Sequence, residues 1–200
     1  MPQIVVLHYT GMASAAAARD RLCDPAVEVS AHYLIARDGD IIHMVDEAQR
    51  AWHAGHGEWR GQADINSRSI GIELDNAGTH PFSAPLMSAL EQLLQDILNR
   101  WSIPPSEVIG HSDMAPGRKS DPGARFDWAR LARQGLARPA GAGPFDGAVA
   151  PAQFRKAAQL AGFTAPVPDQ TLLEAVRLRF RPFASGPLTA ADMAALPRVD

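Results

Sequence analysis

Two short apolar runs that lie far apart in the chain each lead to a histidine, and this arrangement limits the folds that the chain can adopt. The first run, QIVVLHYT, contains His8, and the second, Val108 and Ile109, leads almost directly into His111. Short β-branched runs of this kind predict buried strands. The two imidazoles can meet only if these strands are neighbours whose ends lie at one edge of a sheet.

A carboxylate follows His111 in a loop rich in glycine and proline, GHSDMAPGRKSDPG. Asp121 precedes a proline, which favours an extended backbone, and alternate residues of an extended segment project to the same side, so Lys119 and Asp121 should face one pocket. His8, His111 and Asp121 together offer two imidazoles and one carboxylate, which suit zinc. Three protein ligands leave one position open, and an open position is typical of catalytic rather than structural zinc.

The residues alone leave this interpretation open. A single histidine at a strand end is more often a hydrogen-bonded core or surface residue than a metal ligand. The competing histidines are His32, His43, His53, His56 and His80. Two of them lie in the glycine-rich HAGH segment, which we interpret as an exposed polar loop. Glu73, on the less apolar face of the alternating strand SIGIELDN, can be either a catalytic carboxylate or a solvated side chain.

Further patterns predict the elements around these strands. The segment AHYLIARDGDIIHMV has apolar runs on both sides of an Asp-Gly pair, which predicts a β-hairpin. Leucines and isoleucines recur at helical spacing from Pro85 to about Trp101, and they predict the strongest amphipathic helix of the chain. Shorter helices are expected after the capping residues Ser14 and Asp127.

The composition changes after Leu136 to ARPAGAGPFDGAVAP, which is typical of a linker. We therefore divide the chain into residues 1–138, a linker of residues 139–150 and an all-helical extension of residues 151–200. Three short helices are expected in the extension, at Pro151–Ala161, at about Asp169–Phe180 and at Thr189–Leu196. About fifty residues of this kind are marginally stable alone, so we expect the extension to pack on the first domain.

Charge and composition exclude several classes of protein. Basic and acidic residues are intermixed and the net charge is −3, which argues against a nucleic-acid partner. No apolar segment is long enough for a membrane span. The single cysteine, Cys23, cannot form a disulfide within the chain. No leader peptide precedes the first strand, so we expect a cytoplasmic protein, or a periplasmic or exported one if a leader has been removed. We also expect a monomer.

The motifs VLHYTG, SAHYLI, RAWHAG, INSRSIGIEL and GHSDMAPGRKSDPG occur in this order over residues 3 to 136. In order and spacing they resemble the type 2 N-acetylmuramoyl-L-alanine amidases, zinc enzymes that share a fold with peptidoglycan recognition proteins. The resemblance implies an α/β fold with a central mixed sheet flanked by helices. It also implies a peptidoglycan or muropeptide substrate, cleaved at the amide between N-acetylmuramic acid, or its 1,6-anhydro form, and L-alanine.

The resemblance assigns roles to particular residues. It implies that His8, His111 and Asp121 bind zinc. It implies that Glu73 is the catalytic carboxylate and that Lys119 stabilises developing negative charge. By their position in the family segments, the resemblance also implies that four residues line the substrate groove: Tyr33, Trp52, His53 and Asn66.

Two other functions compete with the amidase. Relatives of this fold that recognise muropeptides without cleaving them typically lack a zinc ligand, whereas all three ligands are present here. A zinc peptidase that cuts within the stem peptide is the second alternative, because a water-activating zinc does not choose its amide. The extension resembles peptidoglycan-binding modules more loosely, and a stabilising helical cap is an equal alternative for it.

Overall fold

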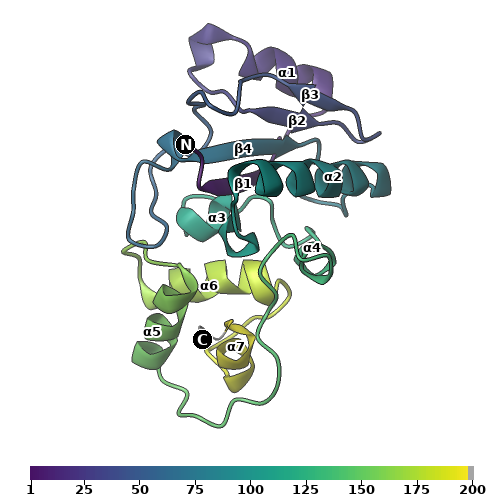
Figure 1. Cartoon of the computed structure of the whole chain (residues 1–200). Coiled ribbons are helices and arrows are strands. Elements are labelled where there is room, and N and C mark those ends of the chain that lie inside the picture. Colours follow the sequence, from purple (N-terminus) through teal and green to yellow (C-terminus); the bar gives the residue numbers. More distant parts are fainter. Residues whose placement is uncertain (198–200) are drawn as a thin grey trace.

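The computed structural model describes residues 1–197, and its centre is a five-stranded β-sheet of order β3-β2-β4-β1-β5 (Figure 1). The strands are β1 (Ile4–Tyr9), β2 (Tyr33–Ile35), β3 (Ile41–His43), β4 (Ser69–Leu74) and β5 (Val108–Gly110). β2, β4, β1 and β5 run parallel, and β3 pairs antiparallel with β2 at the edge. The predicted mixed sheet and hairpin are therefore confirmed. In the hairpin loop Gly39 takes a positive φ of 97°.

The register of the two central strands places two candidate site residues side by side. His8 of β1 lies opposite Glu73 of β4. Since side chains alternate along a strand, His8 shares a face with Ile4 and Val6. Both of these isoleucine and valine side chains are fully buried in the core on that face.

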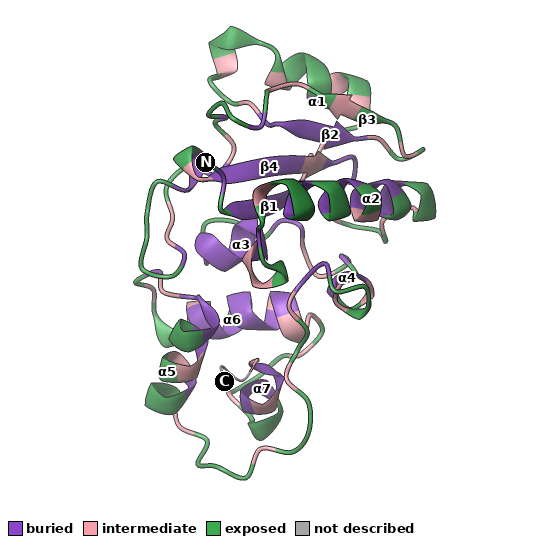
Figure 2. Cartoon of the chain, in the orientation of Figure 1, coloured by how far each residue is buried: buried purple, intermediate pink, exposed green. Residues whose placement is uncertain are grey.

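The helix α2 (Ala84–Trp101) covers the opposite face of the sheet (Figure 1). Its buried residues recur every three or four positions, as the sequence predicts, and they pack against the other side of β1 and β4. The main members of this core are Val5, Leu7, Ile70, Ile72, Leu90 and Leu94. The helix is buried along its inner side and exposed along its outer side (Figure 2).

The C-terminal helices complete the core on the His8 face. They are α5 (Pro151–Ala161), α6 (Asp169–Phe180) and α7 (Ala190–Ala195), close to the predicted ranges. α6 lies against the short helix α3 (His111–Met114). All four residues of α3 are buried, and so are six of the twelve residues of α6 (Figure 2). One continuous apolar cluster joins the sheet to the extension and includes Val6, Ile109, Met114, Phe154, Phe163 and Val176. The expected packing of the extension on the first domain is confirmed.

A buried ion pair also joins the extension to α3. Nη1 of Arg179 in α6 lies 3.2 Å from Oδ2 of Asp113 in α3, and Nη2 of Arg179 donates to the carbonyl oxygen of Val108 at 3.0 Å. Asp113 in turn accepts the backbone N–H of Gly110 at 2.8 Å and so caps the first turn of α3. The extension therefore contacts the segment in which β5 ends and α3 begins with His111.

The remaining helices begin at the expected capping residues. Ser14 accepts the N–H of Ala17 at the start of α1 (Ala15–Leu22), and Asp127 accepts the N–H of Arg130 at the start of α4 (Trp128–Arg133). Three short 3-10 helices cover Pro25–Val27, Ile65–Ser67 and Pro105–Glu107. Within residues 1–197, no helix combines the length and the hydropathy that crossing a bilayer requires.

Candidate metal centre

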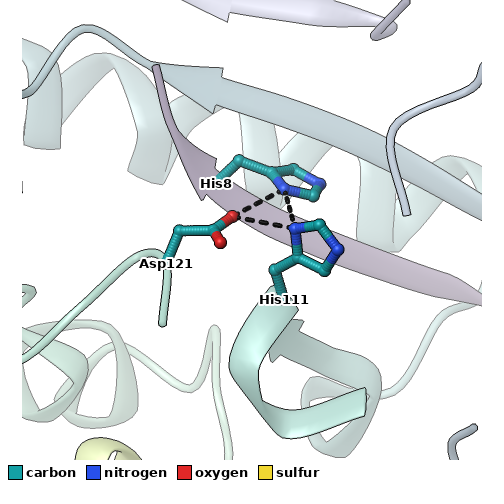
Figure 3. Close-up of side chains that lie close together, drawn as sticks. All are labelled: His8, His111 and Asp121. Carbon is teal, nitrogen blue, oxygen red and sulfur yellow. Dashed lines mark hydrogen bonds and ion pairs between the residues drawn. The ribbon is translucent and has the colours of Figure 1, made fainter. Parts of the chain in front are cut away.

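Three side chains from separate segments converge at the carboxyl ends of β1 and β5. His8 comes from β1, His111 is the first residue of α3, and Asp121 lies in the loop after α3 (Figure 3). Nδ1 of His8 lies 3.0 Å from Nδ1 of His111. Oδ2 of Asp121 lies 2.9 Å from Nδ1 of His8 and 3.0 Å from Nδ1 of His111. All three side chains are buried, and they form a candidate metal site.

The donor set fits a divalent cation. Nε2 of His111 lies 2.8 Å from the carbonyl oxygen of Ala54, which can only accept, so a neutral His111 carries its proton on Nε2 and its lone pair on Nδ1. Burial, and next the charge of His111, lower the pKa of His8 to about 4, so His8 is neutral at pH 7. Two imidazole nitrogens and a carboxylate oxygen therefore surround one point.

The distances agree with this interpretation. Bonds of about 2.0–2.1 Å, the length zinc prefers, place the ligand atoms of a tetrahedral ion roughly 3.3–3.4 Å apart. The observed separations of 2.9 Å to 3.0 Å are slightly shorter, so a small outward movement of the three side chains would accommodate the ion. A cation at this point removes the repulsion among electron pairs that otherwise face one another.

A cavity of about 400 Å³ opens beside the three candidate ligands, and Glu73, Lys119 and Trp52 line it. Oε2 of Glu73 is buried without a hydrogen-bond partner among the described residues. Burial, and next the charge of Asp121, raise the pKa of Glu73 to about 8, although Lys119 opposes this shift. A carboxyl group with a pKa near neutrality can both accept and return a proton, which is what general acid–base catalysis requires.

The loop after α3 brings a second charged group to the cavity. The N–H of Ser112 donates to the carbonyl oxygen of Asp121 at 3.0 Å, and the N–H of Lys119 donates to the carbonyl oxygen of Ala115 at the same distance. These bonds fold the loop back on α3. Lys119 and Asp121 consequently line the same cavity, as their spacing predicts.

Arg118 is a cavity residue that the sequence analysis did not identify. Its Nη2 donates to the carbonyl oxygen of Ala54 at 2.7 Å and also to that of His56. It therefore fixes the same backbone segment that bonds His111. An arginine beside a lysine in a polar loop looks like an ordinary surface residue, and the one available signal is its position within the GRKSD motif.

The four residues expected to contact substrate lie in different surroundings. Trp52 lines the cavity with 54% of its surface exposed. His53 also lines it, and the interpretation of the whole HAGH segment as an exposed loop is wrong at this residue, because Nδ1 of His53 lies 3.1 Å from Nε2 of His8. Burial, and next the charge of His8, keep the pKa of His53 well below its ordinary value.

Tyr33 and Asn66 do not line the cavity. Tyr33 belongs to the core on the α2 face of the sheet, and its hydroxyl donates to Oε1 of Glu47 at 2.6 Å. Asn66 is buried, and its Oδ1 accepts the backbone N–H groups of His53 at 3.1 Å and Ala54 at 2.8 Å. Substrate contact by these two residues stays a prediction that their positions do not favour.

Comparison with known proteins identifies the family. Residues 1–124 match the N-acetylmuramoyl-L-alanine amidase family, and this range contains the mixed sheet together with all three candidate ligands. The chain belongs to this family.

Individual relatives agree with this assignment. The chain is 39% identical over 153 residues to the N-acetylmuramoyl-L-alanine amidase AmiD of Escherichia coli. The aligned residues make up 67% of this chain and 53% of the relative. It is 41% identical over 103 residues to the 1,6-anhydro-N-acetylmuramyl-L-alanine amidase AmpD of Enterobacter cloacae, covering 52% of this chain and 55% of the relative. The chain thus spans about half the length of the curated relatives it matches.

Solved structures extend the similarity to the C-terminal helices. AmiD from E. coli in complex with anhydro-N-acetylmuramic acid-L-Ala-D-gamma-Glu-L-Lys superposes with a TM-score of 0.86 at 31% identity, covering 98% of this chain and 86% of that one. AmpDh3 from Pseudomonas aeruginosa in complex with an anhydromuramic pentapeptide gives a TM-score of 0.88 at 32% identity, covering 98% and 89%. An AmpD structure covers 68% of this chain.

Proposed function

We propose that this protein is a zinc-dependent amidase that hydrolyses the bond between the lactyl group of N-acetylmuramic acid and the L-alanine of a stem peptide. The observation that carries the proposal is the buried trio of His8, His111 and Asp121 beside a cavity that also holds Glu73. Membership of the amidase family supports the same bond. The complexes of AmiD and AmpDh3 with anhydromuramyl peptides support a muropeptide as substrate.

The residues around the cavity supply complementary chemistry. Zinc, when bound, polarises the scissile carbonyl and lowers the pKa of a water molecule toward about 7. Glu73 lines the same cavity, and a carboxylate there can take a proton from the attacking water and return it to the leaving amine. Lys119 lines the same cavity, and its ammonium group stabilises negative charge that develops on the carbonyl oxygen.

The product identifies the bond that is cut. Purified protein loaded with zinc would be incubated with 1,6-anhydromuropeptide and, separately, with intact sacculi, and the products analysed by mass spectrometry. Amidase action releases a peptide with a free L-alanine amino terminus. Cleavage within the stem peptide would instead support a zinc peptidase, and binding without any cleavage would support a recognition module. Both results contradict the proposal, and the two substrates together show which form is preferred.

We also propose that the extension contributes to glycan binding. A second cavity, of about 430 Å³, lies where α4 meets the end of α6, and Arg125, Trp128 and Phe183 line it. Phe183 is 74% exposed, with the guanidinium of Arg125 5.8 Å from its ring centroid. An exposed aromatic side chain at the edge of a largely apolar cavity is typical of a binding surface.

Deleting the extension is not a clean test of glycan binding, because deletion exposes the apolar cluster that it shares with the sheet. The single substitution Phe183→Ala avoids this problem, since its side chain is largely exposed. Sedimentation with insoluble cell wall should show weaker binding by the variant, while hydrolysis of a small soluble muropeptide stays unchanged. Equal sedimentation of both proteins would leave the extension with a structural role.

A further inference from the structure

The hydrogen bonds behind His8 form a chain whose direction is determined by its last member. The hydroxyl of Ser69 lies 2.6 Å from the carbonyl oxygen of Ile65, which can only accept, so Ser69 uses its hydrogen there. Nε2 of His53 lies 3.2 Å from the same hydroxyl oxygen. This oxygen must therefore accept, and His53 carries its proton on Nε2.

The direction passes on to the candidate metal ligand. With its proton on Nε2, a neutral His53 has a lone pair on Nδ1, and this atom lies 3.1 Å from Nε2 of His8. His8 must then donate from Nε2, which leaves the lone pair of its Nδ1 directed at His111 and Asp121. The side chain of His53 thus selects the form of His8 that can bind a metal through Nδ1.

The neighbouring residue does the same for the second imidazole. The carbonyl oxygen of Ala54 accepts from Nε2 of His111 at 2.8 Å. A single amide oxygen, Oδ1 of the buried Asn66, accepts the backbone N–H groups of both His53 and Ala54. Two consecutive residues therefore hold both candidate ligand histidines, and Asn66 holds those two residues in place.

The strand beneath this segment leaves room for it. A Cβ atom at Gly71 would lie 2.4 Å from two ring atoms of His53, so the ring would have to move if this residue carried a side chain. Glycine in the interior of a strand is otherwise unfavourable, because it adds no packing and loses backbone entropy on folding. The close approach of the His53 ring gives this glycine a physical reason.

From this geometry we infer that His53 is a positioning residue of the metal centre. His53, oriented by Ser69, selects the form of His8 that binds a metal through Nδ1. Asn66 holds His53 and also Ala54, whose carbonyl selects the same form of His111, and together these contacts set metal affinity. The inference rests on the proposed zinc centre and deepens it. It assigns His53 and Asn66 to the support of the metal ligands in place of substrate contact. Residues that orient metal-binding histidines in this way typically change metal affinity about 10- to 100-fold when they are removed.

Metal affinity, measured by competition with a chromophoric zinc chelator, tests the inference independently of catalysis. His53→Leu removes both hydrogen bonds and should weaken zinc binding about 10- to 100-fold. His53→Gln keeps an amide oxygen that accepts from His8 and an amide group that donates to Ser69, so it should bind zinc within a few-fold of the wild type. Trp52→Ala is the matched control, because the Trp52 side chain lines the cavity without bonding a ligand, and it should leave the affinity unchanged.

Ser69→Ala provides a variant that disturbs packing least. It removes the acceptor for Nε2–H of His53 and should weaken zinc binding less than His53→Leu does. Equal affinity in the wild type, His53→Leu and Ser69→Ala would overturn the inference, and so would an equal loss in His53→Leu and His53→Gln, which would indicate packing alone. Circular dichroism of each metal-free variant reports whether it folds.

Nitrogen-15 NMR of the histidine rings adds a readout that a packing role would not produce. In the zinc-loaded wild type, His8 and His111 should both show a protonated Nε2 and a metal-bound Nδ1. In His53→Leu the Nε2–H signal of His8 should broaden or shift while that of His111 persists, and in Asn66→Ala both signals should change. A wild type that binds no zinc would defeat the proposed function itself, whereas normal zinc binding without amidase products would defeat only the assignment of the bond.

Discussion

Replacing Arg179 by methionine should destabilise the protein by about 3–5 kcal/mol, which is the typical cost of removing one partner from a buried ion pair. Arg179 and Asp113 are 5% and 1% exposed, so the carboxylate that remains cannot be solvated without local rearrangement. The guanidinium also lies 3.4 Å from the ring centroid of Trp128, and it donates to the Val108 carbonyl. These further contacts favour the upper part of the range.

The pair itself is incompletely satisfied, which leads to a second, sharper expectation. Burial lowers the pKa of Arg179 to about 10 and raises the pKa of Asp113, and one polar atom of each side chain has no hydrogen-bond partner among the described residues. The free-energy cost of desolvating the two charges thus cancels much of the attraction between them. The double variant Asp113→Asn/Arg179→Met removes both charges but keeps an oxygen that accepts the Gly110 N–H, and it should recover about 2 kcal/mol relative to Arg179→Met alone.

Urea unfolding of the metal-free proteins at pH 7 measures these free energies without a contribution from bound metal. At pH 5 the loss in Arg179→Met should be smaller, because an unpaired buried carboxyl group has a raised pKa and becomes neutral. A cost below about 1 kcal/mol for Arg179→Met, or additive costs in the double variant, would refute this account of how the extension is joined to α3.

Three further outcomes follow from the metal centre and its acid. Glu73→Ala should keep zinc and lose activity, whereas His8→Ala and Asp121→Ala should lose both. Metal analysis, together with a muropeptide digest, measures the two properties. Equal zinc loss in all three variants would contradict the assignment of Glu73 as the proton-transfer group and of His8 and Asp121 as ligands. In the metal-free protein the pKa of Glu73 is raised to about 8. The protonated group therefore favours the folded state below about pH 4.5, and this contribution is lost as the pH rises toward 8. In urea unfolding, Glu73→Gln should consequently be more stable than the wild type at pH 8 but not at pH 4.5. Chelation should lower the melting temperature, and added zinc should restore it, since an ion that binds only the folded state stabilises it; an unchanged melting temperature would argue against a metal at this site.

Local patterns in the amino-acid sequence are enough to predict several parts of this protein. Strand periodicity in QIVVLHYT and SIGIELDN put His8 with Ile4 and Val6 and set Glu73 apart from Ile72, and the structure keeps these faces. The same patterns placed α2, the hairpin and the capped helices within a few residues. The predicted ligand trio came together because two strand ends and one tight loop leave little freedom in where their side chains point.

The polar residues that support these three ligands can be identified only once the separate segments are packed together. His53 bonds His8 across 45 positions, and Arg179 pairs with Asp113 across 66, and neither pairing leaves a local pattern in the chain. The HAGH segment is predicted to be a solvated loop because it consists of small and polar residues. In the structure, however, the ring of His53 packs against the sheet at Gly71, where no side chain is in the way. Tyr33 was assigned to the groove by its motif, whereas strand alternation turns it toward α2. Contacts of this kind depend on how separate elements pack, and periodicity within one element carries no information about its partner.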